Sequence, residues 1–201
     1  MLLLTFAAQF SAPERLNIKA WFRVEDFPSE ISATGAWDVG IRTIVRPDGT
    51  IQSCKVEYPS KNAKLNALTC SIILKRAKFR AARGLDGQPI YGADRATVIW
   101  VMDSRISVPM DAIIGVKALP GGASYAIVPI QFLTNTSGSP LSCAPDRRAP
   151  DYDIKYNFDP ALAAVACQQV GKAVAVQPVR DDSGSAVPAV QNAVVQFIVT
   201  Q

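Results

Sequence analysis

The four cysteines are the residues of this chain best suited to chemistry, and they stand at Cys54, Cys70, Cys143 and Cys167. A cysteine thiolate can act as a nucleophile, bind a metal or form a disulfide. No two of the four have the CxxC spacing that is typical of structural zinc sites and thioredoxin-like redox centres. The spacing therefore favours disulfides, with small buried core side chains as the alternative.

Histidine is absent from the 201 residues. This absence excludes a Ser-His-Asp triad, a Cys-His pair, an HExxH motif and any histidine metal site. A P-loop, a dinucleotide-binding fingerprint and a paired-acid motif are also missing from the sequence. We therefore expect no enzymatic activity, no cofactor and no metal.

The cysteines belong to an internal repeat. In each copy a glycine is followed after five residues by a cysteine, and a second cysteine is followed after seventeen residues by a glycine. The two sets are Gly49, Cys54, Cys70, Gly87 and Gly138, Cys143, Cys167, Gly184. Such self-similarity predicts two structural copies in tandem, each of about 90 residues.

Four cysteines permit three disulfide connectivities. Because the cysteines recur at equivalent places in both copies, the repeat selects Cys54–Cys70 and Cys143–Cys167. Each bridge would stabilise its copy by about 3 kcal/mol in the chain-entropy model. Disulfides would also imply an oxidising compartment.

The first copy has the pattern of a strand, turn, strand, helix and strand. Apolar and polar residues alternate over 39–46, the turn Pro47-Asp48-Gly49 follows, and a return strand covers 51–58. Apolar residues at helical spacing predict an amphipathic helix over 65–79 that carries Cys70. A strand over 96–102 ends the copy, and Ser29 is placed to begin a short helix ending near Gly35.

The second copy repeats this order more loosely, with strands over 124–133 and 193–200. Asp159 and Pro160 predict the start of a helix that runs to about residue 174. The expected fold is α+β, with two tandem modules that each hold a small antiparallel sheet of about three strands. One main helix and a short N-terminal helix pack on each sheet. The first module spans 14–104, a connector 105–122 and the second module 123–201.

Residues 1–13 are apolar at the start and resemble part of a secretory signal, although the stretch is short and lacks a basic beginning. It is too short to span a bilayer, so we expect no transmembrane anchor in this chain. The formal charge of +4 falls short of the basic stripe of a nucleic-acid-binding protein.

Several short motifs, taken in order, resemble the C-terminal domain of the TonB family. The matching residues in the first copy are Phe27-Pro28, Pro47-Asp48-Gly49, Tyr58-Pro59-Ser60, Leu65-Asn66, Phe79-Arg80-Ala81 and Gly87-Gln88-Pro89. The second copy is similar over Gly138, Val176-Gln177-Pro178 and the last strand. True energy transducers of this family also have a membrane-spanning helix and a proline-rich spacer, and neither is present here.

The resemblance implies a periplasmic binding module that engages an outer-membrane receptor or another envelope protein. Such domains pair a receptor peptide with an edge strand, which is β-augmentation. The strand residues expected to bind are Val98, Ile99, Trp100, Val101 and Met102, together with Val195, Gln196, Phe197, Ile198 and Val199. The alternative is a structural envelope protein whose two sheets pair with each other and leave no peptide site.

Overall fold

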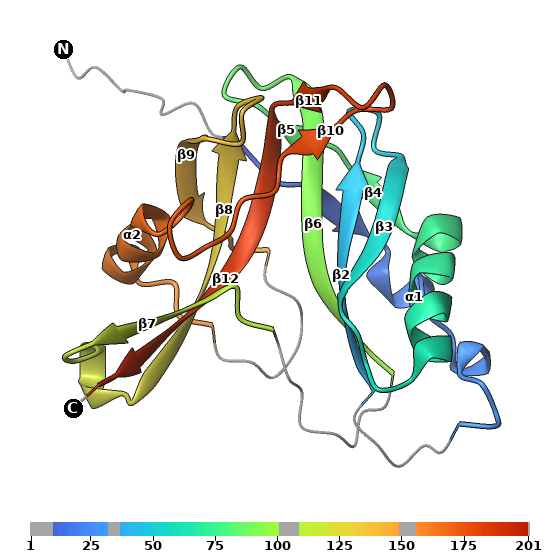
Figure 1. Ribbon diagram of the computed structural model, residues 1–201, viewed down its shortest axis with the longest axis horizontal. Coiled ribbons are helices and arrows are strands. Elements are labelled where there is room, and N and C mark those ends of the chain that lie inside the picture. The colour runs from blue at the N-terminus through green and yellow to red at the C-terminus, as the bar shows by residue number, and fades with distance from the viewer. Residues whose placement is uncertain (1–9, 32–36, 101–108, 149–155, 201) are drawn as a thin grey trace.

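The computed structural model describes residues 10–31, 37–100, 109–148 and 156–200 (Figure 1). In these residues the chain is mostly sheet and carries two α-helices, so the expected α+β class is confirmed.

In the first half, strand β2 (Asp38–Val45) lies between β3 (Ile51–Tyr58) and β6 (Pro89–Ile99), and both pairings are antiparallel. The hairpin between β2 and β3 turns at Gly49, whose φ of 84° is in the left-handed region that favours glycine. A Cβ at this position would also lie 2.5 Å from the Phe79 carbonyl oxygen. The predicted turn is therefore confirmed, and both its φ angle and the close carbonyl explain why it needs glycine.

Helix α1 (Ala63–Arg76) packs on this half of the sheet. The Asn62 side chain caps it by accepting hydrogen bonds from the backbone N–H groups of Lys64 and Leu65 at 3.0 and 3.2 Å. Its buried face has helical spacing and consists of Leu65, Thr69, Ile72 and Ile73. The helix ends three residues before the predicted end, because Ala77 is extended and Lys78–Arg80 form strand β4.

The second half has the same arrangement. Strand β8 (Tyr125–Thr134) lies between β9 (Pro140–Pro145) and β12 (Ala189–Val199), again antiparallel to both. Helix α2 (Pro160–Gln168) begins as predicted, with the Asp159 carboxylate accepting from the N–H groups of Ala161 and Leu162 at 2.7 and 3.1 Å. It ends well before residue 174, and the chain turns at Gly171, where φ is 81°.

The two halves share one sheet, which differs from the expectation of separate small sheets. Residues 91–93 of β6 pair in parallel with residues 189–191 of β12, and we call this pairing the junction. It joins the strands into an eight-stranded sheet with the order β3-β2-β6-β12-β8-β9. Strand β5 (Ala82–Arg83) adds to β6, and β7 (Ala112–Val116) adds to β12.

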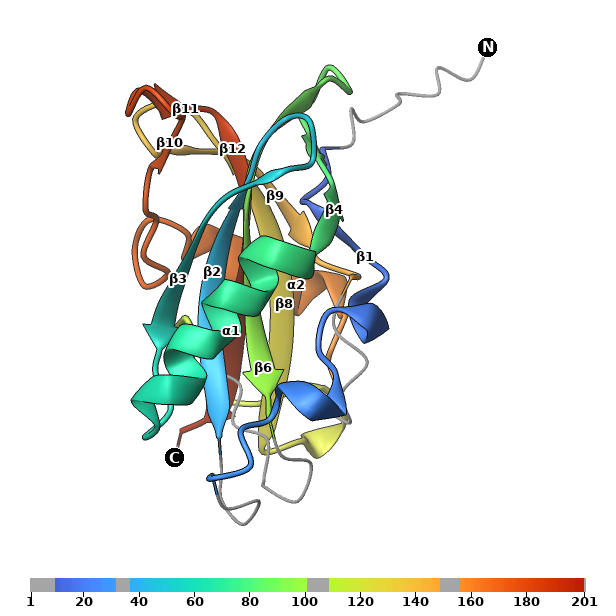
Figure 2. The ribbon, with the colours of Figure 1, turned by 90° about the vertical axis from the view of Figure 1, so that its right-hand side faces the viewer.

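The two helices lie on opposite faces of this sheet, with α1 in front and α2 behind in Figure 2. Val39, Ile41 and Val45 of β2 face the core under α1. The adjacent residue Ile44 packs with Ala93 and Ala189 on the other face, which is the face that carries α2. Alternate strand residues therefore fill two cores on the two sides of the sheet.

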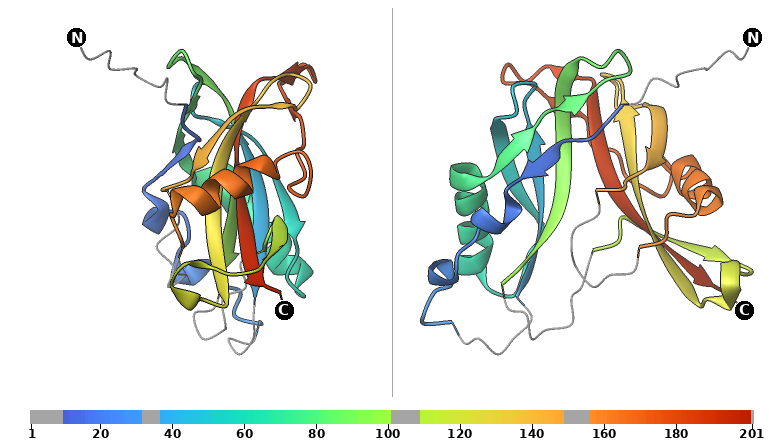
Figure 3. Two further views of the ribbon diagram at one scale, coloured as in Figure 1. Left: turned by 90° about the vertical axis from the view of Figure 1, so that its left-hand side faces the viewer. Right: turned by 180° about the vertical axis from the view of Figure 1, so that it is seen from behind.

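The N-terminal segment crosses the sheet on the α1 side and touches both halves (Figure 3, right). Strand β1 (Glu14–Leu16) pairs with β4, and Phe10 and Ala12 are buried with Leu133 and Val190 of the second half. Gly92 permits the crossing, because a Cβ there would lie 2.3 Å from a Pro13 ring carbon. Residues 10–13, predicted as the end of a signal-like segment, thus belong to the folded core.

Three smaller features complete the description of the fold. Most of the short helix expected after Ser29 falls on residues 32–36, which lie outside the described part, and 3-10 turns precede Ser29 at Ile18–Ala20 and Val24–Asp26. The connector contains β7 and a 3-10 turn at Pro120–Gly122. A small hairpin of β10 (Val179–Arg180) and β11 (Ala186–Val187) precedes β12.

Candidate binding edges of the sheet

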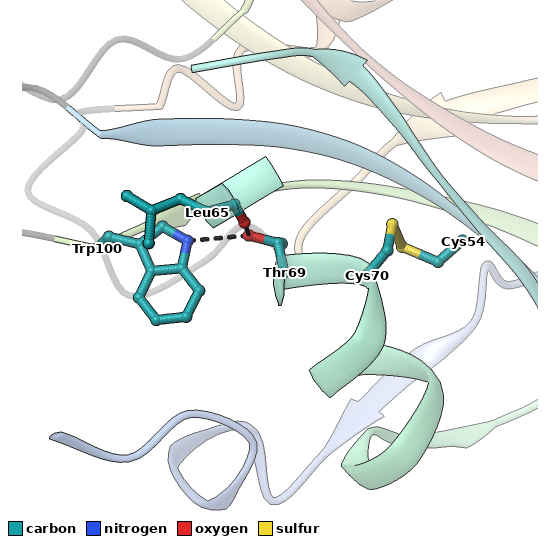
Figure 4. Close-up of a disulfide and its surroundings, with 5 residues drawn as sticks. All are labelled: Cys54, Leu65, Thr69, Cys70 and Trp100. Carbon is teal, nitrogen blue, oxygen red and sulfur yellow. Dashed lines mark hydrogen bonds between the residues drawn. A yellow bond between two sulfur atoms is a disulfide. The ribbon is translucent and has the colours of Figure 1, made fainter. Parts of the chain in front are cut away.

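Both predicted disulfides are confirmed, and they use all four cysteines. Cys54 is bonded to Cys70 with a Cα–Cα distance of 5.5 Å, and Cys143 to Cys167 with 5.7 Å. Each bond ties an outer strand, β3 or β9, to the helix that packs on it (Figure 4 shows the first). The two outer strands of the sheet are therefore covalently anchored.

The first predicted binding strand is half-buried over its described residues, Val98 to Trp100. Val98 and Ile99 end β6, and they pair with β2 on one side. The Trp100 indole N–H donates to the Thr69 hydroxyl at 2.9 Å (Figure 4). The Trp100 ring packs against Phe22 and Phe27. Trp100 thus supports the core under α1. Val101 and Met102 lie outside the described residues.

The second predicted binding strand has strand partners on both sides. Val195, Gln196, Phe197, Ile198 and Val199 pair with β7 in parallel, and the first four also pair with β8. Val195 and Phe197 are fully buried in the core under α2. Backbone groups that already bond two neighbouring strands cannot accept a third strand, so these residues are unsuited to β-augmentation in this structure.

Beyond the junction, β6 and β12 diverge and no longer pair with each other. Side chains instead form hydrogen bonds with the backbone groups that the two strands direct towards each other. Asn192 accepts from the Arg95 N–H at 2.7 Å and donates to the Arg95 carbonyl at 3.1 Å. Asp111 similarly accepts from the Val194 N–H at 2.7 Å, while its own N–H donates to the Val194 carbonyl at 2.8 Å. At both positions these contacts satisfy backbone N–H and carbonyl groups that a neighbouring strand would otherwise bond.

A buried polar chain crosses the junction on the α2 side. Arg42 donates to the Gln191 side chain at 3.1 Å and to the Gln177 carbonyl at 3.2 Å. Gln191 in turn donates to the Thr134 hydroxyl at 3.4 Å. Burial, together with the nearby Arg95 charge, lowers the pKa of Arg42 to about 10. Arg42 remains charged at neutral pH and bonds the two halves.

In the described part of the chain, three strands of the main sheet longer than the two-residue β5 have a neighbour on one side along their whole length, and β6 has one neighbour beyond the junction. Within the described residues β3 pairs with β2 alone, β9 with β8 alone and β7 with β12 alone. Strand β9 begins and ends with proline, which weakens it as a template for another strand. Strand β7 has only five residues. Strand β3 has eight residues and no proline, so it is the best edge for adding a strand.

The side chains along β3 alternate between the core and the other face. Cys54 and Val56 pack under α1, whereas Lys55 is exposed and Glu57 is paired with Arg95 on the opposite side. Tyr58 at the end of the strand is 43% exposed. Figure 2 shows β3 at the outer side of the sheet, with α1 lying over one face. No strong sequence signal distinguished this return strand from the others.

Comparison of the chain with protein-family models, with curated proteins and with solved structures gave no match. In the described parts of the chain, no helix is long and apolar enough to cross a membrane.

Proposed function

We propose that this protein is an exported, non-enzymatic binding module of the TonB-like type that engages an extended peptide at the outer edge of β3. The peptide would belong to an outer-membrane receptor or another envelope protein, and the compartment would be the periplasm. The binding mode is β-augmentation, in which the peptide backbone bonds the free side of the strand. We place the site at the outer edge of β3, because residues 195–198 of β12 already pair on both sides, whereas Val98 and Ile99 are a short described stretch that pairs with β2 on one side.

The observation that carries this proposal is the combination of an open edge with a rigid anchor. Strand β3 pairs with one neighbour among the described residues, and the Cys54–Cys70 bond holds it on α1. A strand held in its bound geometry loses little conformational freedom when a peptide adds to it. Both disulfides also support export, because such bonds persist in oxidising compartments.

The structural alternative has one observation in its favour. The junction pairs the sheets of the two halves, as expected for an envelope protein built only for support. That alternative also requires that no edge accepts a peptide. The two hypotheses therefore differ in whether the outer edge of β3 binds a peptide.

The test is a titration of ¹⁵N-labelled protein with peptides from the N-terminal segments of outer-membrane receptors. We expect saturable amide shifts along β3 and smaller shifts along β9. The same peptide is then N-methylated at one backbone position at a time. Because alternate residues of a strand face the same neighbour, methylation should abolish binding at every second position and leave the other positions unaffected.

Lys55→Glu provides a matched variant, since Lys55 projects from β3 at an exposed position. It should change the affinity for charged peptides, because opposite charges across strands stabilise a pair by roughly 0.2–1 kcal/mol. Lys61→Glu, in the following loop, is the control for net charge. Absence of β3 shifts with every peptide, or N-methyl effects without a period of two, would favour the structural alternative.

A further inference from the structure

A pocket of about 390 Å³ opens where β6 and β12 diverge beyond the junction. Its walls come from both halves of the sheet, from the N-terminal segment and from the residues that follow β9. Arg95 of β6 and Asp111, which directly precedes β7, both line it. The volume is in the range of sites that bind small molecules.

The charged side chains in the wall of the pocket are paired with opposite charges. Three of these pairs are Arg15 with Asp94, Arg148 with Asp146, and Glu14 with Arg80. Arg15 and Arg148 each bind their carboxylate through two nitrogens, at distances between 2.7 and 3.1 Å. Such bidentate pairs neutralise their own charges and fix the wall of the pocket.

The two remaining carboxylates of the lining, Glu57 and Asp111, are balanced by two guanidinium groups. Arg95 donates to Glu57 Oε2 at 2.9 Å and lies 3.5 Å from Asp111 Oδ1. Buried Arg42, outside the lining, interacts electrostatically with both Glu57 and Arg95. The charges around the pocket therefore cancel, and a charged ligand would enter a partly buried site without a counter-charge of its own, which is unfavourable.

Two polar atoms in this balanced site are open to a ligand. The Val194 N–H holds Asp111 by donating to Oδ2 at 2.7 Å. Glu57 and the Asn192 carbonyl hold Arg95 through Nε and Nη1, at 2.9 and 3.1 Å. Asp111 Oδ1 and Arg95 Nη2 make no hydrogen bond with the described residues, and neither is among the buried atoms that lack a partner, so both keep accessible surface. The pocket thus offers an acceptor beside a donor.

Tyr58 and Pro109 form an apolar wall of the same site. Both lie close to Gly40 of β2, where an added Cβ would be 2.9 Å from Tyr58 and 3.2 Å from Pro109. Burial raises the pKa of Tyr58, and the Asp111 charge acts in the same direction, so the phenol shares the surroundings of that carboxylate. An apolar chain can therefore lie next to the two open polar atoms.

We propose that this pocket binds a small neutral amide that carries an apolar chain. The amide N–H groups would donate to Asp111 Oδ1, the amide carbonyl would accept from Arg95 Nη2, and the chain would lie against Tyr58 and Pro109. An amide presents a donor and an acceptor side by side, whereas a carboxylate of the same shape lacks the donor and an ammonium group lacks the acceptor. This site is separate from the outer edge of β3 and does not depend on peptide binding there.

The experiment uses the full chain at neutral pH with three probes of the same chain length, which are hexanamide, hexanoate and hexylammonium. Titration of ¹⁵N-labelled protein should show saturable binding of hexanamide, with amide shifts concentrated at Gly40, Arg95, Asp111 and Val194. The two charged probes should bind at least about tenfold more weakly, because each leaves one polar partner unmatched and adds an unbalanced charge. Absence of saturable hexanamide binding, equal binding of either charged probe, or shifts scattered over exposed apolar residues would overturn the proposal.

Asp111→Asn should reverse the preference of the site. The new amide oxygen can still accept from the Val194 N–H, so the amide nitrogen takes the place of Oδ1 and offers a donor, while the site gains a positive charge. We expect hexanamide affinity to fall at least about tenfold and hexanoate affinity to rise.

Glu25→Gln, at an exposed carboxylate outside the pocket, is the matched control for the loss of one negative charge. It should change both affinities by less than about twofold. A folded Asp111→Asn variant that still prefers hexanamide to hexanoate would contradict the assignment. If that variant does not fold, the order of the three probes on the unmodified chain decides.

Discussion

Asn192 is the residue that ends the junction. The parallel pairing stops at Ala93 and Gln191, and the next β6 residue that faces β12 is Arg95. The Asn192 amide offers an acceptor and a donor at the spacing of the Arg95 backbone groups, at 2.7 and 3.1 Å. It occupies the position in the second copy that corresponds to Arg95 in the first, 97 residues away. Two equivalent residues of the repeat thus bond each other.

Replacing this amide should be costly. Asn192→Ala leaves the Arg95 N–H without its acceptor in a partly buried site, and we expect the free energy of unfolding to fall by about 1–3 kcal/mol. Urea denaturation measures the loss, and hydrogen exchange at the Arg95 amide should rise in parallel. Gln88→Ala, at an exposed turn position, should stay within about 0.5 kcal/mol of the unmodified chain. Similar losses in both variants would contradict the role of Asn192.

Asp111 makes the stability of the protein depend on pH, and the sign of this dependence is opposite to that of an ordinary paired carboxylate. Its pKa is raised, chiefly by burial, with Arg95 acting in the opposite direction and Glu57 adding to the rise. A raised pKa in the folded state favours the protonated form. Its contribution to stability is therefore full below the unfolded value and is lost as pH rises through the folded pKa.

Asp111→Asn tests this sign, because the amide oxygen can still accept from the Val194 N–H. We expect the stability of the variant, relative to the unmodified chain, to increase as pH rises from 3 towards 7. Denaturation curves at several pH values measure the difference in free energy of unfolding between the variant and the unmodified chain. The contributions of the other carboxylates are common to both chains and largely cancel in this difference. A relative stability that falls over this interval would show that the pairing of Asp111 with Arg95 outweighs its burial.

At the scale of elements, each disulfide connects an outer strand to its helix, so the two bonds serve as controls for each other. Removing Cys54 and Cys70 together, as alanines, should lower stability by about 3 kcal/mol. It should also speed amide exchange along β3 and weaken peptide binding there. The matching change at Cys143 and Cys167 should affect β9 and leave peptide affinity at β3 unchanged. Equal loss of affinity in both variants would argue against the outer edge of β3 as the site.

The sequence predicted the elements whose signals are local. The turn at Gly49, the helix start at Asp159 and both disulfides follow from turn chemistry, capping and repeat spacing. Alternation along a strand indicates a strand and its faces, but it does not identify the neighbouring strand. For this reason the pairing of residues 195–199 with both β7 and β8, and the open margin of β3, could not be predicted.

At the scale of the whole molecule, the two halves form the shared sheet with a symmetric arrangement of strands and helices. Equivalent strands β6 and β12 lie side by side in parallel, and the helices of the two copies pack on opposite faces (Figure 1). A twofold axis along the strand direction produces this combination, because it exchanges the faces while keeping the strand direction. The arrangement of the two halves thus resembles that of two subunits in a symmetric dimer.

The N-terminal segment adds contacts that hold the two halves together. Phe10 and Ala12 are buried between Ala82 of the first half and Leu133 and Val190 of the second. A chain that begins at residue 14 loses both side chains, whereas a chain that begins at residue 10 keeps them. We expect the shorter chain to be less stable by about 3–5 kcal/mol, the usual loss for a buried phenylalanine. Chemical denaturation of the two chains measures this difference, and equal stabilities would contradict the packing of Phe10.

The shared sheet and the N-terminal segment together predict that the two halves unfold as one cooperative unit. The chain offers a convenient test, because its three tryptophans, Trp21, Trp37 and Trp100, all lie in the first half. Tryptophan fluorescence therefore follows the first half, while far-UV circular dichroism follows both. In urea the two transitions should coincide in the unmodified chain. They should separate when Asn192→Ala is combined with a start at residue 14, because both changes weaken contacts between the halves and leave each core under its own helix intact. Separate transitions in the unmodified chain would show that the junction is too weak to couple the halves.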